Sequence, residues 1–264
     1  VGASKVAVVS LLLGHPINAA APIAFLVTLA VYTHNNLTDL AEDGVNDPDR
    51  ASLFERRTRL FSGIAVGAYL GALGLAALGG PFALALTLFP GVLGVLYSSR
   101  WLPGAGPDRL KDVLVVGTCA VALAWAVPLA LLPVAFAGGG VGVGAICVLA
   151  FFFLRAVFAV ELFNVRDVAG DRREGVGTLP VAVGIGPTRW ILGALNLASA
   201  GLLVGAVLSG ALGPLALAAG LGVAYSQSLV ASLDGRRADW LCLASYLESP
   251  IMLFALATAV ALSG

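Results

Sequence analysis

The chain has 264 residues, of which 59% are hydrophobic and 11% are charged, and its formal net charge is zero. Soluble globular domains carry about 25% charged residues, so this composition predicts a membrane protein. No basic patch stands apart from acidic neighbours, and we therefore expect no nucleic-acid partner.

Apolar runs of about 20 residues, the length that crosses a bilayer, recur along the whole chain. We count nine, the first of them short: 1–13, 17–36, 60–79, 82–98, 112–132, 140–162, 187–207, 211–231 and 240–262. They predict an all-α, polytopic membrane protein that forms a single domain over residues 1–264. Because its apolar run is short, we expect the first helix to be truncated.

The connections between these runs alternate in charge. Nearly all charged residues fall in the segments 37–59, 99–112, 161–189 and 232–239, to which we assign every lysine and arginine except Lys5. With nine spans, this pattern places all basic residues on one side of the membrane. Basic loops face the cytoplasm, so we expect the N-terminus inside and the C-terminus outside the cytoplasmic membrane.

Two of the charged connections begin with polar residues at helical spacing. Asn35, Asp39 and Asp43 stand at i, i+4 and i+8 at the end of the second run, and so share one helix face. The second motif follows the sixth run in the same manner, with its own asparagine and two aspartates at i, i+3 and i+7: Asn164, Asp167 and Asp171.

Oxygen donors in this pattern suit Mg²⁺, which proteins hold with a few carboxylates together with substrate phosphates. We expect the two motifs to face each other and to hold Mg²⁺ against a diphosphate, with the two asparagines as neutral oxygen ligands or phosphate donors. Basic side chains that can balance the diphosphate charge lie nearby. They are Arg50, Lys111, Arg166, Arg172 and Arg173. The alternative, a solvated surface loop, explains one such motif better than two in the same helical phase.

Two glutamates and a row of glycines lie in or beside the apolar runs. Glu161 is in phase with the second motif, either as another ligand or as a surface charge, whereas Glu248 on the last run has no assigned role. Gly63, Gly67 and Gly71 form a small-residue stripe at four-residue spacing. Such a stripe predicts the close approach of a neighbouring helix.

The motifs resemble those of the UbiA superfamily of intramembrane prenyltransferases. The first motif reads Asn35-Asn36-x-x-Asp39-x-x-x-Asp43, with Asn36 where the family has aspartate. The likeness extends over residues 31–184. Its further parts are Asn46-x-Pro48-x-Arg50, Leu96-Tyr97-Ser98, Leu110-Lys111-Asp112, Asp167-x-x-Gly170-Asp171-Arg172 and Gly177-Thr178-Leu179-Pro180.

This resemblance implies a nine-helix bundle around a central cavity, with both acidic motifs at its cytoplasmic mouth. Four aspartates would bind Mg²⁺ and the diphosphate: Asp39, Asp43, Asp167 and Asp171. Lys111, Arg50 and Arg172 would neutralise the leaving group. Asn35 and Tyr97 would orient it, with Asn164 a further diphosphate contact. The prenyl tail would lie between helices that open sideways to membrane lipid.

The implied reaction moves an isoprenoid chain from a prenyl diphosphate to a lipophilic acceptor, either a quinone-type ring or a lipid precursor. The alternatives are a terpene cyclase of the same family, which needs no acceptor, and a transporter or non-catalytic scaffold. Transporters place their ionisable groups near the bilayer midplane, whereas these gather at one face. The acceptor and the chain length stay open. The aromatic residues considered for the cavity floor are Trp125, Phe151, Phe153, Phe158 and Tyr225.

Overall fold

The computed structural model describes residues 2–38, 40, 44, 48–98, 109–110, 113–234 and 237–263. All regular elements in these ranges are helices, which confirms the predicted all-α class. In chain order they are α1 (Gly2–Leu12), α2 (Ala20–Thr38), α4 (Pro48–Arg56), α5 (Thr58–Ala77), α6 (Gly80–Ser98), α7 (Val116–Ala137), α8 (Val143–Glu174), α9 (Leu179–Val183), α10 (Ile185–Leu208), the 3₁₀ helix η2 (Pro214–Ala219), α11 (Gly220–Ala231), α12 (Ala238–Ser245) and α13 (Glu248–Ser263).

Seven helical segments among the described residues are long and apolar enough to cross a membrane. They are α5, α6, α7, α8, α10, η2 with α11, and α12 with α13. The predicted count of nine is not confirmed. The first predicted span corresponds to α1, which has only 11 residues. The second corresponds to α2, whose 19 residues end in polar side chains.

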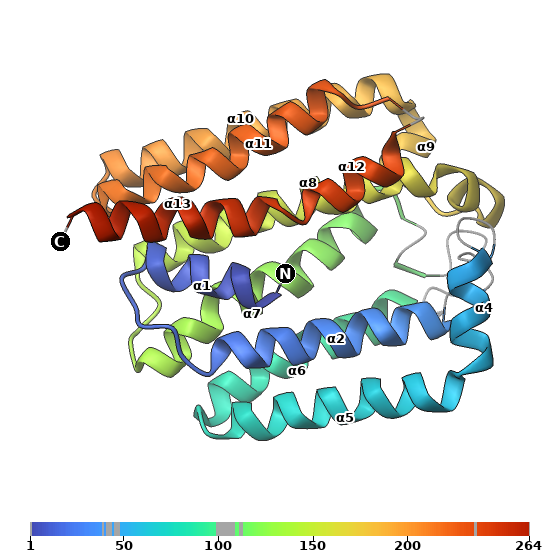
Figure 1. The fold of residues 1–264 in the computed structure, drawn as a ribbon, viewed down its shortest axis with the longest axis horizontal. Helices are drawn as coiled ribbons and strands as arrows, with labels where there is room; N and C mark the ends of the chain where they lie inside the picture. The colour runs from blue at the N-terminus through green and yellow to red at the C-terminus, as the bar shows by residue number, and fades with distance from the viewer. Residues whose placement is uncertain are drawn as a thin grey trace.

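The helices pack as a closed ring. Each long helix contacts the next one along the chain, from α5 with α6 through to α11 with α13. The ring closes because α13 packs against α1, α1 against α2, and α2 against α5. Figure 1 shows α2, α5 and α6 on one side, α10, α11 and α13 on the other, and α7 and α8 between them.

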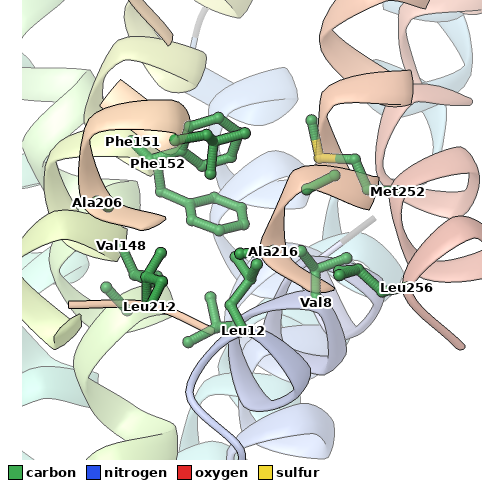
Figure 2. Close-up of a cluster of buried hydrophobic side chains, with 14 of the residues drawn as sticks. Val8, Leu12, Val148, Phe151, Phe152, Ala206, Leu212, Ala216, Met252 and Leu256 are labelled. Carbon is green, nitrogen blue, oxygen red and sulfur yellow. The ribbon is translucent and has the colours of Figure 1, made fainter. Parts of the chain in front are cut away.

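Apolar side chains fill the interior and also cover the outside. Phe151 and Phe152 of α8, Met252 of α13 and Val8 of α1 point into one shared cluster (Figure 2). Large apolar side chains on the outer faces are exposed, such as Leu208 at 81% and Trp190 at 78%. A surface of this kind needs lipid as its solvent, which agrees with a membrane protein.

The glycine stripe on α5 does not form the expected helix contact. Among the described residues, a side chain added at Gly63 or Gly67 would meet nothing within 4 Å, and one at Gly71 would only touch Leu26. Instead, α5 buries a row of alanines on its opposite side: Ala65, Ala68, Ala72 and Ala76. These small side chains, rather than the glycines, allow the close approach of α2.

The connections rich in charge lie at one end of the molecule. Figure 1 shows α4, α9, the end of α2 and the start of α12 at the end opposite the C-terminus. The turns that join α1 to α2, α5 to α6, α7 to α8 and α10 to η2 lie at the other end (Figure 1). Both motif-bearing helices therefore finish at the same end of the bundle.

Candidate active site

The second acidic motif occupies the last turns of α8. This helix ends at Gly175, whose φ of 73° is left-handed and therefore suits glycine. The backbone N–H of Val176 donates to the carbonyl oxygen of Asp171 at 2.9 Å, which closes the helix end. After this turn Thr178 donates its hydroxyl to Asp171 Oδ2 at 3.0 Å. The side chain of Asp171 is thus held where the chain leaves α8.

Asp167, one turn earlier, is paired with a neighbour in sequence. The guanidinium of Arg166 donates to both oxygens of Asp167, at 2.7 and 2.8 Å, and also lies 5.1 Å from the ring centre of Phe163. Both charged groups are about one-quarter exposed. A carboxylate has about four lone-pair sites, so Asp167 can keep this bidentate pair and still bind a cation.

Glu161 lies about two turns further into the bundle. Of the two alternatives given by the sequence, a further ligand or a surface charge, the structure excludes the surface charge. Its side chain is 4% exposed, so it is not a solvated surface charge. Thr118 of α7 donates to Glu161 Oε1 at 2.5 Å, and Asn164 Nδ2 donates to Glu161 Oε2 at 3.1 Å. This contact uses one of the two hydrogens on the amide nitrogen of Asn164 and fixes the orientation of the amide, whose oxygen is the atom that can bind a cation.

An apolar cavity with a polar mouth lies between α2, α6 and α7. It encloses about 610 Å³ of empty space, part of which is open to the surroundings. The predicted diphosphate contacts Asn35 of α2 and Tyr97 of α6 both line it, so the structure brings these two residues together. The rings of Tyr32 and Trp125 also line it and stack with their centres 5.7 Å apart. The other lining residues are Val31, Pro90, Leu93, Gly94, Ala120, Val121 and Ala124.

The first turns of α7 connect the two halves of the site. Thr118 contacts Glu161 on α8, while Ala120, Val121 and Ala124 face the cavity. The acidic face of α8 and the cavity therefore share one helix as a wall.

The remaining predicted residues fall into two groups, those outside the described ranges and those on α2, α4 and α8. Asp39, Asp43 and Lys111 lie outside the described residues. Arg50 lies in the first turn of α4, and Arg172 is exposed in the last turn of α8. Asn36 donates its side-chain amide to the carbonyl oxygen of Tyr32 at 2.7 Å, a contact within α2.

A second buried polar cluster lies inside the bundle. It shows that the assignment of every lysine and arginine except Lys5 to a charged connection was wrong for Arg155. Arg155 belongs to the membrane-spanning part of α8 and is 2% exposed, so it does not belong to a charged connection. It donates to both oxygens of Glu248 at 2.8 and 2.7 Å, and to Asn196 Oδ1 at 2.6 Å. The sequence signal for this buried group is a single arginine inside the apolar run 140–162, outside all four charged segments.

Comparison with known families decides the identity of the fold. The model of the UbiA prenyltransferase family matches residues 7–261, nearly the whole chain. The chain belongs to the UbiA prenyltransferase family. Membership confirms the resemblance drawn from the motifs and the enzyme class that it implied. No match was found among curated proteins.

Solved structures of UbiA homologues have the same fold. An apo UbiA homologue from Aeropyrum pernix K1 is 16% identical with a TM-score of 0.69, covering 99% of this chain and 96% of its own. A UbiA homologue from Archaeoglobus fulgidus bound to GPP and Mg²⁺ is 19% identical with a TM-score of 0.66, covering 98% and 94%. A structure concerning digeranylgeranylglyceryl phosphate synthase is 15% identical with a TM-score of 0.62, covering 97% and 91%.

The donors on α8 of this UbiA-family protein fit Mg²⁺ chemically. Asn164, Asp167 and Asp171 offer only oxygen, the ligand atom that this hard cation prefers. Within the described ranges, no three His, Cys, Asp or Glu side chains converge as a metal cluster. The carboxylates expected to complete the set, Asp39 and Asp43, lie outside those ranges.

Proposed function

We propose that this prenyltransferase moves an isoprenoid chain from a prenyl diphosphate to a lipophilic acceptor, with Mg²⁺ as its cofactor. The observation that carries the proposal is the shared wall of α7. It joins the acidic face of α8 to an apolar cavity with Asn35 and Tyr97 at its mouth. A diphosphate with Mg²⁺ needs the acidic face, and a prenyl chain needs the apolar cavity. A homologue of this fold binds GPP together with Mg²⁺, which supports the assignment.

The head group is proposed to lie among the two acidic motifs. Asp39, Asp43, Asp167 and Asp171 would hold Mg²⁺, with Asn164 as a neutral oxygen donor beside them. Bound there, Mg²⁺ supplies positive charge that stabilises the departing diphosphate. Lys111, Arg50 and Arg172 balance the rest of its charge, and the hydroxyl of Tyr97 and the amide of Asn35 orient it.

The apolar cavity performs a different task. Departure of the diphosphate breaks the bond between its oxygen and the prenyl chain. It leaves an allylic carbocation, which reacts with any nucleophile within reach, including water. The walls formed by Val31, Leu93 and Val121 exclude water from that carbon until the acceptor attacks it. The acceptor is proposed to be a quinone-type ring or a lipid precursor that enters from the surrounding membrane lipid.

The site is proposed to open toward the cytoplasm. The end of the bundle that carries α4 and the last turns of α8 also carries Arg50, Arg56, Arg172 and Arg173. Basic residues of short connections stay in the cytoplasm. This orientation places the N-terminus inside and the C-terminus outside.

The test is turnover by the purified protein in detergent with Mg²⁺, prenyl diphosphates of 10 to 20 carbons and extracted membrane lipid as the source of acceptor. We expect diphosphate release coupled to a prenylated lipid, seen by mass spectrometry. Asp171→Ala should lower turnover by at least about 100-fold, because it removes a charged ligand. Asp239→Ala, an exposed carboxylate at the start of α12, is the matched control and should keep full activity.

Three results would contradict this proposal in different ways. Release with a cyclic hydrocarbon and no coupled lipid would identify a terpene cyclase. No release from any prenyl diphosphate would leave a transporter or scaffold. Full activity of Asp171→Ala would remove the site from α8 even if the reaction were correct.

A further inference from the structure

A second, inner cavity continues the site cavity deeper into the bundle. It lies between the same three helices, is lined almost entirely by apolar side chains, and has free space for about one water molecule at most. The lining residues are Ala24, Val27, Thr87, Trp125, Pro128, Leu129 and Leu132. The hydroxyl of Thr87 donates to the carbonyl oxygen of Ala83 at 2.8 Å, so it asks for no polar ligand. The inner cavity is therefore a narrow apolar gap behind Trp125.

Trp125 is the residue that lines both cavities. Its indole stacks on the ring of Tyr32, with an angle of 17° between the ring planes. Tyr32 stands one helical turn before Asn35 on α2, on the side of the polar mouth. The stacked pair thus crosses the groove between α2 and α7, with the outer cavity on one side and the inner cavity on the other.

The other aromatic residues considered for the cavity floor are placed elsewhere. Phe151 and Phe153 pack in the cluster formed with α1, α10 and α13, and Phe158 packs against α10 and α11. Tyr225 donates its hydroxyl to the carbonyl oxygen of Ala244 at 2.9 Å. Of the five, Trp125 alone borders the described cavities.

We propose that Trp125 sets the length of the isoprenoid chain by closing the floor of the outer cavity. This inference rests on the proposed function, because it takes the outer cavity as the site of the prenyl tail. Chains that end before Trp125 fit, and longer chains must displace the indole from its stacking partner.

Helix dimensions give the expected length. The outer cavity follows α6 from Pro90 to Tyr97, roughly 10 Å at 1.5 Å per residue. An extended chain advances about 1.2 Å per bond, so a four-bond isoprene unit takes roughly 5 Å. The outer cavity therefore holds about two units, a geranyl chain. Beyond Trp125 the inner cavity is too narrow for a further isoprene unit, so a longer chain needs the space that the indole fills.

The experiment measures kcat/KM for geranyl, farnesyl and geranylgeranyl diphosphate, each with Mg²⁺ and the same acceptor lipid. The unaltered protein should prefer geranyl diphosphate. Trp125→Ala removes the indole from the floor of the outer cavity, and should raise the ratio of farnesyl to geranyl turnover by at least about tenfold, the effect of a methylene or more in an apolar pocket. Trp190→Ala, the same change on the outer face of α10, should leave the ratio unchanged.

A double variant tests the direction of the effect. Val27 lines the inner cavity, so Val27→Phe in the Trp125→Ala background should fill the new space and restore the preference for geranyl diphosphate. Trp125→Leu is the milder change, used if the alanine variant does not fold. It should shift the preference in the same direction toward farnesyl diphosphate.

The failure of this inference differs from the failure of the proposed function. If the unaltered protein releases diphosphate but prefers geranylgeranyl diphosphate, or if both Trp125 variants keep its chain-length ratio, Trp125 is not the floor. If no prenyl diphosphate is turned over, the proposed function is wrong and the chain-length inference is overturned with it.

Discussion

At the scale of single residues, Glu161 shows how a buried carboxylate determines what its neighbour can do. An asparagine side chain offers either an oxygen acceptor or a nitrogen donor in a given direction, and a cation can use only the oxygen. Glu161 accepts a hydrogen bond from Asn164 Nδ2 and another from the hydroxyl of Thr118. Outer-shell contacts of this kind orient ligands and tune metal affinity.

We expect Glu161→Gln to weaken the response to Mg²⁺ more than it weakens the fold. The glutamine is uncharged and has one acceptor oxygen instead of two, so its hydrogen bond to Asn164 is weaker even when the Thr118 hydroxyl accepts from its amide. The Mg²⁺ concentration for half-maximal turnover should rise by roughly 10-fold or more. The stabilisation of the protein by Mg²⁺ with an unreactive thiodiphosphate analogue, followed by thermal unfolding, should fall in parallel.

Thr118→Ser keeps the donated hydroxyl and serves as the control for this change. It should respond to Mg²⁺ like the unaltered protein, whereas Thr118→Val should resemble Glu161→Gln. An unaltered Mg²⁺ requirement in Glu161→Gln would show that the contact does not position Asn164.

At the scale of helices, α8 carries polar groups on two different faces. The face with Glu161 and Asn164 contacts α7, while Arg155 points to the opposite side, toward α10 and α13. There Ser226 of α11 donates to Glu248, and Asn196 of α10 donates to Gln227 Oε1 at 2.9 Å. Four helices are thereby joined by one network of hydrogen bonds in the apolar interior.

This network leads to a prediction about stability. Glu248→Leu leaves the Arg155 guanidinium buried without its carboxylate, which should cost about 3–5 kcal/mol in the free energy of unfolding. The double variant Arg155→Leu with Glu248→Leu removes both charges and should be more stable than either single variant. Thermal unfolding in detergent compares the three. If the double variant is as unstable as the sum of the singles, the two groups are not coupled.

At the scale of the whole molecule, the arrangement concentrates charge at one end of an apolar ring. α4 and the last turns of α8 lie at that end, and the C-terminal end of α13 lies at the other (Figure 1). A bilayer that surrounds the apolar outer faces would separate these two ends by its full thickness. The orientation of the chain then decides which end meets the cytoplasm.

Labelling of single cysteines tests this orientation. In a variant without Cys119, Cys147 and Cys242, a cysteine is introduced either at exposed Asp49 on α4 or at exposed Ser263 at the end of α13. Because basic residues are retained inside, a membrane-impermeant maleimide should label Ser263→Cys on intact cells and Asp49→Cys only in inverted vesicles. The reverse pattern would place the site outside the cytoplasm.

Much of this fold, and part of the site, can be predicted from the sequence. The helical spans follow from runs of apolar residues, since a bilayer requires about 20 of them whatever the rest of the chain does. The phase of Asn164, Asp167 and Asp171 follows from the helical period, which is a local property. Asn35 follows from the same helical spacing and Tyr97 from the family resemblance, and the structure places both at one cavity.

Only the tertiary structure decided which helix faces meet. In a membrane protein, lipid-facing and buried faces are both apolar, so hydropathy does not distinguish the alanine row of α5 from its glycine stripe. The burial of Arg155, the contact of Glu161 with Thr118, and the position of Trp125 between two cavities each depend on helices distant in the sequence. Local sequence determines that a helix forms and what it carries; packing determines what each side chain faces.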